Sequence, residues 1–365
     1  MKHGTILIAG SLAQRPDYGG HAWVFLQYLL GFRRLGWDVL FLDRLDDSMC
    51  HDRTGQPCAA KDSWNLASLS QTLAALGLGN QWSVRCGNVT FGVPREQVLV
   101  KARESTLLLN VMGYLDDAEI LAAAPRRVFL DIDPGFGQVW QALGLATLFA
   151  GHDAYVTIGE NIGQPDCTVP TCGIDWLTTP QPVVLDQWPV RNGASCTAFT
   201  TVASWRGPFG PLEYGGRTYG LRVHEWRRFA ALPMASGQTF EVAMELDAAD
   251  AKDRALLESN GWRLLDPRAI AGGIGDYREF VSGSRAEVMI AKNMYVATRG
   301  GWVSDRSICY LAAGKPVLAQ ETGFSKNHPT GRGLLAFSTP EEAAEGVKAI
   351  NADYPAHCRA AREIA

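Results

Sequence analysis

The sequence predicts an α/β protein made of two Rossmann-like domains in tandem. Its 365 residues are too many for one ordinary domain. Short apolar segments of strand length alternate with segments of helical period, which is typical of parallel sheets covered by helices. The alternation is interrupted at 178–190, where three prolines and the lack of a clear period indicate an extended linker. We therefore expect a first domain at 1–180, a linker at 181–192, a second domain at 193–350 and a C-terminal helix at 351–365.

The first domain opens with a strand, a glycine-containing loop, a helix and a second strand. The apolar strand Thr5–Ala9 precedes a loop that ends in two glycines, and residues 21–35 have helical spacing. Gly36 ends this helix, and 38–43 is the next strand, which we expect to be parallel to the first. At least five parallel strands follow from the continuing pattern, with further strands at 106–111, 127–131 and 154–158 and helices at 118–124 and 139–149.

The same alternation restarts after the linker and defines the second domain. Ser284 and Glu287 form an S-x-x-E pattern, which predicts a capping box at the start of a helix. Ser304 is expected to cap the helix that begins at Asp305. The expected strands are 198–203, 239–244, 262–265, 294–298 and 316–320, and the expected helices are 223–231, 249–260, 284–293, 305–313, 340–351 and 353–365.

The composition indicates a folded protein and argues against several classes of partner. The chain is 47% hydrophobic and 20% charged with a formal net charge of −4, so we expect no nucleic-acid partner. Apolar runs end well before about 20 residues, the length that a membrane span requires. The eight cysteines include no CxxC pair, and the N-terminus lacks a signal-peptide pattern. We therefore expect a cytoplasmic protein with reduced thiols, no membrane span and no metal site, while the oligomeric state is not specified.

Ligands of open parallel sheets bind beyond the carboxyl ends of the strands, so the loops there are the first candidates for a site. Gly19 and Gly20 end the loop after the first strand and let the backbone approach a ligand closely. His21 follows at a helix N-terminus, where it can accept a proton near neutral pH. The alternative is a tight glycine turn with a packed histidine. Two such domains facing each other would make a cleft, a common place for a small-molecule site.

Two further loops of the first domain are expected to face this cleft. Asp131 and Asp133 follow the strand 127–131 and could serve in acid–base chemistry or hold sugar hydroxyls, with Gln138 close behind them. The alternative is an Asp-Pro-Gly turn in which one of the carboxylates caps the next helix. Glu160 and Asn161 follow the next strand, where the alternative is a simple turn.

The strongest signal for anion binding lies in the second domain, after the expected strand 294–298. Two arginines, two glycines and a helix N-terminus come together there, which suits a diphosphate. Each feature alone also fits an ordinary helix cap or glycine turn. Trp205 opens an aromatic loop that either contacts the ligand or is a structured surface loop. The other residues expected to bind the anion are Arg299, Gly301, Trp302, Ser304, Asp305, Arg306, Ser307, Gln320, Glu321, Thr322 and Gly323.

Taken together, these motifs resemble the two-domain GT-B glycosyltransferases, in particular a largely uncharacterised bacterial group of them. The stretch AAGKPV at 312–317 resembles the A-x-G-x-P-V segment of a nucleotide-sugar domain. Many retaining members carry two glutamates before that segment, but the corresponding positions here are Gly301 and Cys309, so retention or inversion stays open. The resemblance covers essentially the whole chain and is carried by GGHAWVFLQYLLGFRRLGWDVLFLDRL, DIDPGFGQ, GSRAE and GWVSDRSICYLAAGKPVLAQETGF.

This resemblance implies transfer of a sugar from a nucleoside diphosphate sugar to the hydroxyl of an unidentified acceptor. The donor would bind the second domain through the anion-binding residues and Trp205, with Asp305 or Glu321 holding sugar hydroxyls. The acceptor would lie on the first domain near Gly19, Gly20, Asp131, Asp133, Gln138, Glu160 and Asn161. Neither cofactor nor metal is implied, since helix dipoles and arginines can neutralise the leaving diphosphate. If the reaction inverts the anomeric centre, His21 is the expected base.

Three other functions remain open at this point. A sugar-nucleotide epimerase uses the same two-domain build but needs no acceptor. A non-catalytic sugar-nucleotide-binding protein would show affinity without turnover. A dinucleotide-dependent dehydrogenase is the weakest alternative, because no G-x-G-x-x-G follows the first strand; the phosphate-binding GxxxxGK[ST] motif is absent as well.

Overall fold

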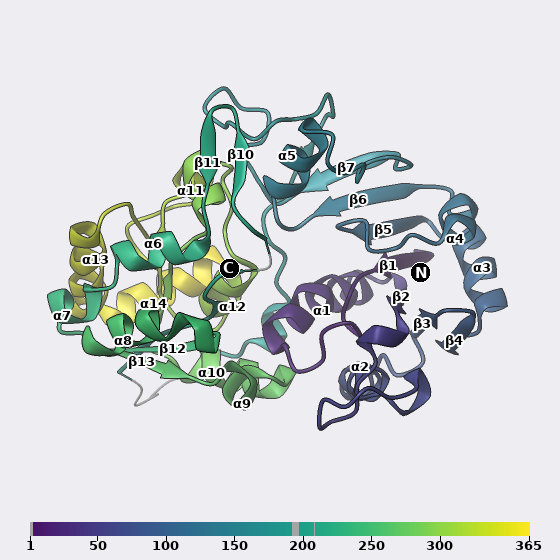
Figure 1. Cartoon of the computed structure of the whole chain (residues 1–365), viewed down its shortest axis with the longest axis horizontal. Coiled ribbons are helices and arrows are strands. Elements are labelled where there is room, and N and C mark those ends of the chain that lie inside the picture. The colour runs from purple at the N-terminus through teal and green to yellow at the C-terminus, as the bar shows by residue number, and fades with distance from the viewer. Residues whose placement is uncertain (1–2, 192–196, 208) are drawn as a thin grey trace. The chain divides into compact units, whose positions relative to one another are not determined.

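The computed structural model describes residues 3–191, 197–207 and 209–365, and it divides into two compact α/β units (Figure 1). The first unit comprises 1–133, 147–157 and 174–177, and the second comprises 134–146, 158–173 and 178–365. The expected junction between the linker and the second domain, at residues 192 and 193, lies outside the described residues, so the sequence-based domain limits stay predictions. Within the described part, no helix is both long and apolar enough to cross a bilayer.

The first unit is built on an eight-stranded sheet in the order β4-β3-β2-β1-β5-β6-β7-β8. The strands from β3 to β7 across the sheet pair in parallel, and β4 runs antiparallel to β3. The five parallel strands expected from the sequence are confirmed. The strands span Thr5–Ala9 (β1), Asp38–Leu45 (β2), Trp82–Cys86 (β3), Val89–Gly92 (β4), Leu107–Val111 (β5), Arg127–Asp131 (β6), Ala154–Thr157 (β7) and Leu177–Thr178 (β8).

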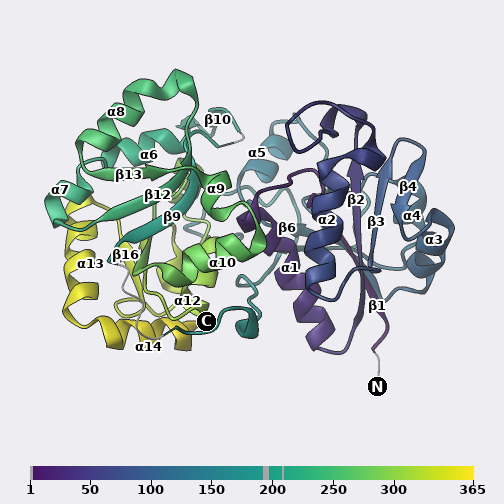
Figure 2. The same ribbon diagram turned by 90° about the horizontal axis from the view of Figure 1, so that it is seen from below.

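Helices pack on this sheet because its strands are apolar on both faces. Val98 and Ala102 of α3 and Ile120 of α4 form one core with strand residues such as Leu7 and Leu108. Figure 2 shows α1 and α2 lying along the sheet. Sequence analysis left residues 44–105 without elements, and the structure places β3, β4, α2 and α3 there. The helices are Gly19–Arg34 (α1), Trp64–Ala75 (α2), Arg95–Glu104 (α3) and Ala118–Ala123 (α4), with 3₁₀ turns at Asp47–Met49 and Ala60–Asp62.

The helix that lies between β6 and β7 along the chain is shorter than expected and belongs to the second unit. The sequence predicts a helix at 139–149, but α5 spans Phe136–Ala142. The helix ends early because Gly144 follows with a φ of 68°, the left-handed conformation that closes helices.

The second unit contains a six-stranded parallel sheet in the order β13-β12-β9-β14-β15-β16. A separate antiparallel hairpin, β10 with β11, follows the first of these strands. The sheet strands span Phe199–Ser204 (β9), Phe240–Glu245 (β12), Trp262–Leu265 (β13), Ala286–Met289 (β14), Val317–Gln320 (β15) and Leu334–Phe337 (β16), and the hairpin strands span Leu212–Tyr214 (β10) and Arg217–Tyr219 (β11).

Helices again cover this second sheet. A core of buried aromatic and aliphatic side chains, including Phe199, Trp226 and Phe240, lies between the strands and α6, α8 and α13. Short 3₁₀ turns lie at Leu185–Gln187, Ala248–Asp250 and Phe324–Lys326. The helices are Arg222–Arg228 (α6), Leu232–Ser236 (α7), Ala251–Ser259 (α8), Pro267–Ala271 (α9), Ile274–Gly283 (α10), Asn293–Thr298 (α11), Asp305–Ala312 (α12), Pro340–Ala352 (α13) and Tyr354–Ile364 (α14).

Two elements of the second unit are the reverse of the sequence expectation. The expected helix 284–293 contains strand β14, and the expected strand 294–298 is helix α11. The S-x-x-E pattern misled because Ser284 closes the preceding helix, where its hydroxyl donates to the Phe280 carbonyl at 2.7 Å. Strand β14 lies in the middle of the sheet and is buried on both faces, so it shows no alternation that would distinguish it from a helix.

Each sheet has a point at which the order of its strands reverses. In the first sheet the chain moves from β1 to β2 and β3, and it resumes on the other side of β1 with β5. In the second sheet it moves from β9 to β12 and β13, and it resumes on the other side of β9 with β14. Loops leaving neighbouring strands in opposite directions open a crevice there, which is where open α/β sheets bind ligands.

Candidate functional site

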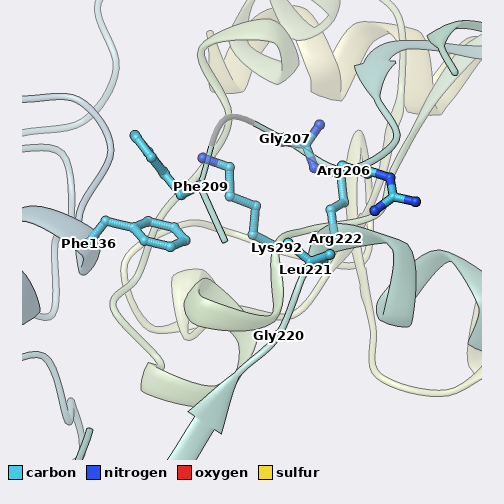
Figure 3. A pocket seen from close by; sticks show the side chains of 8 residues that line it. All are labelled: Phe136, Arg206, Gly207, Phe209, Gly220, Leu221, Arg222 and Lys292. Atoms are coloured by element: carbon cyan, nitrogen blue, oxygen red, sulfur yellow. The ribbon is translucent and has the colours of Figure 1, made fainter. Parts of the chain in front are cut away.

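The switch point of the second unit carries a pocket lined with basic and aromatic side chains (Figure 3). Arg206 lies just beyond the carboxyl end of β9, and Lys292 lies just beyond that of β14. Because β9 and β14 are neighbours, these two loops meet at the reversal of strand order. The pocket is lined by Phe136, Arg206, Gly207, Phe209, Gly220, Leu221, Arg222 and Lys292.

Lys292 is 9% exposed and lies among aromatic rings. Its Nζ is 5.2 Å from the ring centroid of Phe136, 5.4 Å from that of Phe209 and 5.2 Å from that of Tyr295. These distances are those of cation–π contacts, in which the ring faces partly replace the hydration of the ammonium group. Phe209 is held in turn by Phe136 and Trp140, each with ring centroids 4.8 Å away.

The other two cations of this pocket are anchored by its walls. Arg206 donates from Nε to both carboxylate oxygens of the buried Asp250, at 3.0 and 3.1 Å, and this pairing raises its pKa. Arg222 donates to the Ser204 carbonyl at the end of β9, at 3.3 Å. Three basic side chains therefore line one pocket, which makes it a candidate site for an anion beside a flat group.

The glycines expected to cradle phosphate instead accommodate a packed asparagine. Asn161 donates from Nδ2 to the carbonyls of Arg299, at 3.0 Å, and Gly323, at 2.9 Å, and its backbone N–H donates to Gly300. A Cβ on Gly301 would come within 2.9 Å of the Asn161 side chain, and one on Gly323 within 2.6 Å. Asn161 lies so close to both positions that a side chain would not fit there, and both residues have a positive φ. These two facts explain why positions 301 and 323 are glycines.

Polar residues around this asparagine pair with each other. Glu160 forms an ion pair with His328, and Asp166 pairs with both Arg299 and Lys326. Arg299 and Lys326 thus share a carboxylate, which reduces their attraction for a ligand phosphate. The sequence assigned Glu160 and Asn161 to the acceptor and Arg299 to the donor, whereas the structure gathers them in one polar cluster of the second unit.

Three residues expected to bind the donor are buried in the core, and a fourth, Arg306, is half-buried beside it. Trp205 is fully buried, and its indole N–H donates to Asp253 at 3.0 Å. Arg306 pairs with the fully buried Glu287 and also donates to the Val202 carbonyl at 2.9 Å. Burial raises the pKa of Glu287, and the guanidinium of Arg306 opposes that shift. Ser307 and Gln320 are buried as well. These positions hold the sheet and its helices together.

The remaining expected donor residues shape the loops near the ends of β15 and α11. Ser304 caps α12 as expected, accepting from the N–H of Arg306 at 3.2 Å, and Asp305 begins that helix. Thr322 donates to the carbonyl of Trp302 at 2.6 Å, and the Trp302 ring stacks on Tyr295 with centroids 4.1 Å apart. Glu321 accepts from the N–H of Gly323. Tyr295 therefore links this loop pair to the Lys292 pocket.

The switch point of the first unit holds His21 and two hydroxyl-bearing residues. His21 lies in the first turn of α1, whose first residues are Gly19 and Gly20. Its Nε2 is 3.1 Å from both the hydroxyl and the carbonyl oxygen of Ser11, the second residue after β1. Tyr114, beyond the end of β5, also hydrogen-bonds to Ser11, and burial raises its pKa.

Burial and the nearby Arg15 lower the pKa of His21 to about 4. The imidazole is therefore neutral at pH 7 and has a nitrogen lone pair available. A carbonyl oxygen only accepts hydrogen bonds, so the contact with the Ser11 carbonyl assigns the proton to Nε2 and the lone pair to Nδ1.

The paired aspartates are largely occupied by local hydrogen bonds. Asp131 is buried and accepts from the hydroxyl of Thr157 at 2.8 Å and from the N–H of Asp133 at 3.1 Å. Gln138 accepts from the N–H of Gly135 at 2.8 Å and so caps α5. Asp131 thus takes part in a turn, as in the alternative, but the cap contact at α5 comes from Gln138, which that alternative did not name. Asp133 is half-buried beyond the end of β6.

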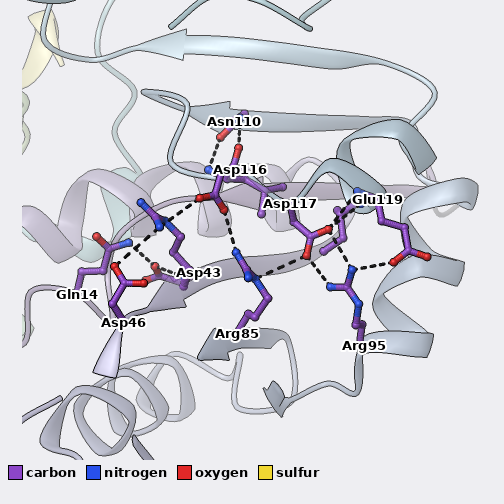
Figure 4. Close-up of polar contacts among 12 residues, drawn as sticks. Gln14, Asp43, Asp46, Arg85, Arg95, Asn110, Asp116, Asp117 and Glu119 are labelled. Carbon is purple, nitrogen blue, oxygen red and sulfur yellow. Dashed lines mark hydrogen bonds and ion pairs between the residues drawn. The ribbon is translucent and has the colours of Figure 1, made fainter. Parts of the chain in front are cut away.

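A second polar network of the first unit was not predicted. Asp43, near the end of β2, accepts from the N–H groups of Ala13 and Arg44 at 2.6 and 2.7 Å and from the Gln14 amide at 2.9 Å. Burial raises its pKa to about 7. The network continues along the sheet edge through ion pairs (Figure 4) among Arg44, Arg85, Arg95, Asp46, Asp116, Asp117 and Glu119. Asp43 thereby anchors the loop that carries Ser11.

The most important residue that sequence analysis missed is Lys292. The S-x-x-E pattern placed it inside a helix, and helix surfaces are ordinary positions for lysine. Recognition of 286–289 as a strand would have put Lys292 in a strand-end loop, where it becomes a candidate. Phe136 and Phe209 carried no signal, because only the tertiary structure brings them to this lysine. In the described part of the chain, no three His, Cys, Asp or Glu side chains gather as metal ligands.

Solved glycosyltransferase structures match nearly the whole chain. An alpha-glucosyltransferase solved with UDP and a 13-mer DNA containing an HMU base has 11% identity and a TM-score of 0.58, over 100% of this chain and 95% of that one. AviGT4, a glycosyltransferase involved in avilamycin A biosynthesis, has 12% identity and a TM-score of 0.53, over 99% and 92%. Anabaena HepE in complex with UDP has 13% identity and a TM-score of 0.52, over 100% and 94%.

These similarities establish the fold of the chain. No protein-family model matches the sequence, and no curated protein matches it significantly. The two parallel-sheet units and the solved neighbours together show the GT-B fold, as the resemblance of the sequence implied.

Proposed function

We propose that the protein is a glycosyltransferase that moves a sugar from a nucleoside diphosphate sugar to an acceptor hydroxyl. The observation that carries the proposal is that Lys292, Arg206 and Arg222 all line one pocket at the switch point of the second sheet. The GT-B fold supports it, as do the UDP complexes of its structural neighbours. The donor site is thus built mainly from the loops after β9 and β14 and from α6.

The chemistry of the pocket fits a leaving diphosphate. As the bond between the anomeric carbon and the phosphate oxygen breaks, negative charge grows on the diphosphate. Fixed cations that face this charge stabilise the transition state more than the ground state. Lys292 and Arg222 would contact the phosphates, while Phe136 and Phe209 exclude water from one side. We propose that these cations make a divalent metal unnecessary.

In this proposal the acceptor binds at the switch point of the first unit. Its hydroxyl oxygen forms the new bond to the anomeric carbon, the diphosphate departs with the electron pair of the old bond, and the hydroxyl proton passes to Nδ1 of His21. A base whose pKa is about 4 is weak, so proton transfer must accompany formation of the bond rather than precede it. Ser11 keeps the imidazole in the required tautomer.

A binding and turnover experiment tests this proposal. Calorimetry with UDP, GDP, ADP and dTDP should show micromolar binding of at least one, and the matching sugar donors should release diphosphate only when an acceptor hydroxyl is supplied. Conversion of the donor sugar without an acceptor would indicate an epimerase, and binding without turnover a non-catalytic protein. Loss of activity with EDTA that Mg²⁺ restores would refute the metal-free mechanism.

A further inference from the structure

A ring of buried hydrogen bonds surrounds the backbone of Lys292. Ala291, on one side, donates its N–H to the Oε1 atom of Gln320 at 3.0 Å. Asn293, on the other side, donates from Nδ2 to the Oε1 atom of Glu225 at 2.9 Å. Gln320 and Glu225 close the ring, because the Gln320 amide donates to the Glu225 Oε2 atom at 2.7 Å. A single carboxylate thus links the residues that flank the lysine.

The same carboxylate also fixes the opposite wall of the pocket. Asn293 accepts at Oδ1 from the N–H of Gly220, at 3.1 Å, and Gly220 lines the pocket. Glu225 belongs to α6, the helix that begins with the pocket residue Arg222. Its carboxylate is 4% exposed and accepts a further bond from Arg228, so three donors satisfy it. Glu225 does not line the pocket itself.

Three elements therefore meet at Glu225, namely α6, the first residue of α11 and the end of β15. Burying a carboxylate costs free energy unless it is fully hydrogen-bonded. An apolar residue would have filled this position at less cost, so the carboxylate has a use beyond packing. The Glu225 carboxylate holds the side-chain amides of Asn293 and Gln320, and the backbone position of Lys292 depends on these two residues.

We infer that Glu225 is a positioning residue that sets Lys292 and the Gly220 wall at the spacing a diphosphate requires. This inference rests on the proposed function for the identity of the ligand. It assigns Glu225, Asn293 and Gln320 no contact with the substrate, and it predicts that they act on the ligand through Lys292.

A double-mutant cycle tests this coupling, with UDP and inorganic pyrophosphate as probes in calorimetry. Glu225→Gln keeps the shape but places an NH₂ group against the donating NH₂ of either Asn293 or Gln320, and the dissociation constant of both probes should rise about tenfold. In a Lys292→Ala background the same change should have less than about a twofold effect, because its target is gone. Glu241→Gln, which removes a carboxylate from an ion pair with Arg263 on the same sheet, is the matched control and should bind as wild type.

A swapped pair provides the rescue. In E225Q/Q320E the amide introduced at position 225 donates to the carboxylate introduced at position 320, so the ring closes again with the opposite polarity. Affinity should then return to within about threefold of wild type. Asn293→Ala, which leaves the buried carboxylate bound to Gln320 and Arg228, should reproduce the loss of affinity if E225Q does not fold.

Three results would overturn the inference: wild-type affinity in E225Q, an undiminished effect of E225Q in the K292A background, or no recovery in a folded E225Q/Q320E variant. These outcomes are distinct from failure of the proposed function. A wild-type protein that binds pyrophosphate but transfers no sugar would disprove the function and still leave the coupling measurable.

Discussion

The two switch points have the same topology and opposite chemistry. In the first sheet the loops after β1 and β5 bring together Ser11, His21 and Tyr114, which are neutral hydrogen-bonding groups. In the second sheet the loops after β9 and β14 bring together Arg206 and Lys292, with aromatic rings beside them. Reversal of strand order decides where a ligand can bind, and the side chains of the loops decide which ligand it is.

The difference extends to how each site is held. At the first switch point a buried carboxylate, Asp43, holds the loop after β1 through the backbone N–H of Ala13 and the side-chain amide of Gln14. At the second a buried carboxylate, Glu225, clamps the loop after β14 through two amide side chains. Each site is therefore carried by a strand-end loop and fixed by an acidic residue from another element. Substitutions at either switch point, or in the groups that support it, should therefore have separable effects.

His21→Ala should have the greatest effect, and that effect should fall on turnover. Loss of a general base should lower kcat by about 10²–10⁴-fold, while the affinity for UDP should stay at the wild-type value because His21 belongs to the first unit and the proposed UDP pocket to the second. Steady-state kinetics and calorimetry on the same preparation measure both quantities. Wild-type turnover in this variant would remove His21 from the mechanism.

Arg306→Met should mainly affect stability. The change leaves Glu287 buried without its partner, which costs about 3–5 kcal/mol of unfolding free energy. Arg263→Met, in an exposed ion pair, should cost less than about 1 kcal/mol. Denaturant unfolding gives both values. A stable R306M protein with weakened UDP binding would return Arg306 to the donor site that the sequence predicted.

Asp43→Asn should change the pH dependence of stability. The raised pKa of Asp43, about 7 against 3.8, means that its contribution is present at low pH and is lost as the pH rises toward 7. The lowered pKa of His21, about 4 against 6.5, gives the reverse: its contribution is present above pH 6.5 and is lost as the pH falls toward 4. The two trends oppose each other in the wild type.

In D43N the trend that comes from Asp43 is removed, while the histidine trend remains. Between pH 4 and pH 7 the stability of the variant should therefore rise by about 3 kcal/mol relative to that of the wild type. Urea titrations at half-unit pH steps measure this difference. A constant offset between the two proteins at all pH values would show that Asp43 does not titrate in this range.

Lys292→Ala should have the mildest effect, on binding rather than stability. Loss of one charged contact to a diphosphate should weaken UDP about 10–100-fold. Lys348→Ala, which removes an exposed lysine paired with Glu345 on α13, is the matched control and should bind as wild type. Equal affinities for the two variants would move the diphosphate out of this pocket.

Much of the fold could be read from the sequence because its strands are short apolar runs separated by glycines and polar loops. Thr5–Ala9, Arg127–Asp131 and Trp262–Leu265 have the limits that the pattern predicted. The exceptions have physical causes. Strand β14 is buried on both faces and lacks alternation, and Ser284 imitates a helix start while it closes a helix.

The candidate site was only partly predictable. His21 was chosen as a candidate because its loop follows the first strand, whose limits the sequence predicted correctly, and its role stays a prediction. Arg306 and Trp205 were chosen because arginine and tryptophan near a strand end often contact ligands, but in this chain both side chains turn inward. Asn161 shows the same limit, since its partners lie more than a hundred residues away along the chain.

Local sequence patterns were enough to specify the fold class, the limits of many elements and the loops in which a site had to lie, because hydrophobic periodicity and glycine turns act over short stretches of chain. Packing in three dimensions selected which residues of those loops face a ligand. Strand order places Lys292 beside Arg206, and long-range contacts bring Phe136 and Phe209 around that lysine. Arg306, which the sequence made a candidate for ligand binding, pairs instead with the buried Glu287. A buried carboxylate without such a partner would cost several kcal/mol of stability, about 3–5.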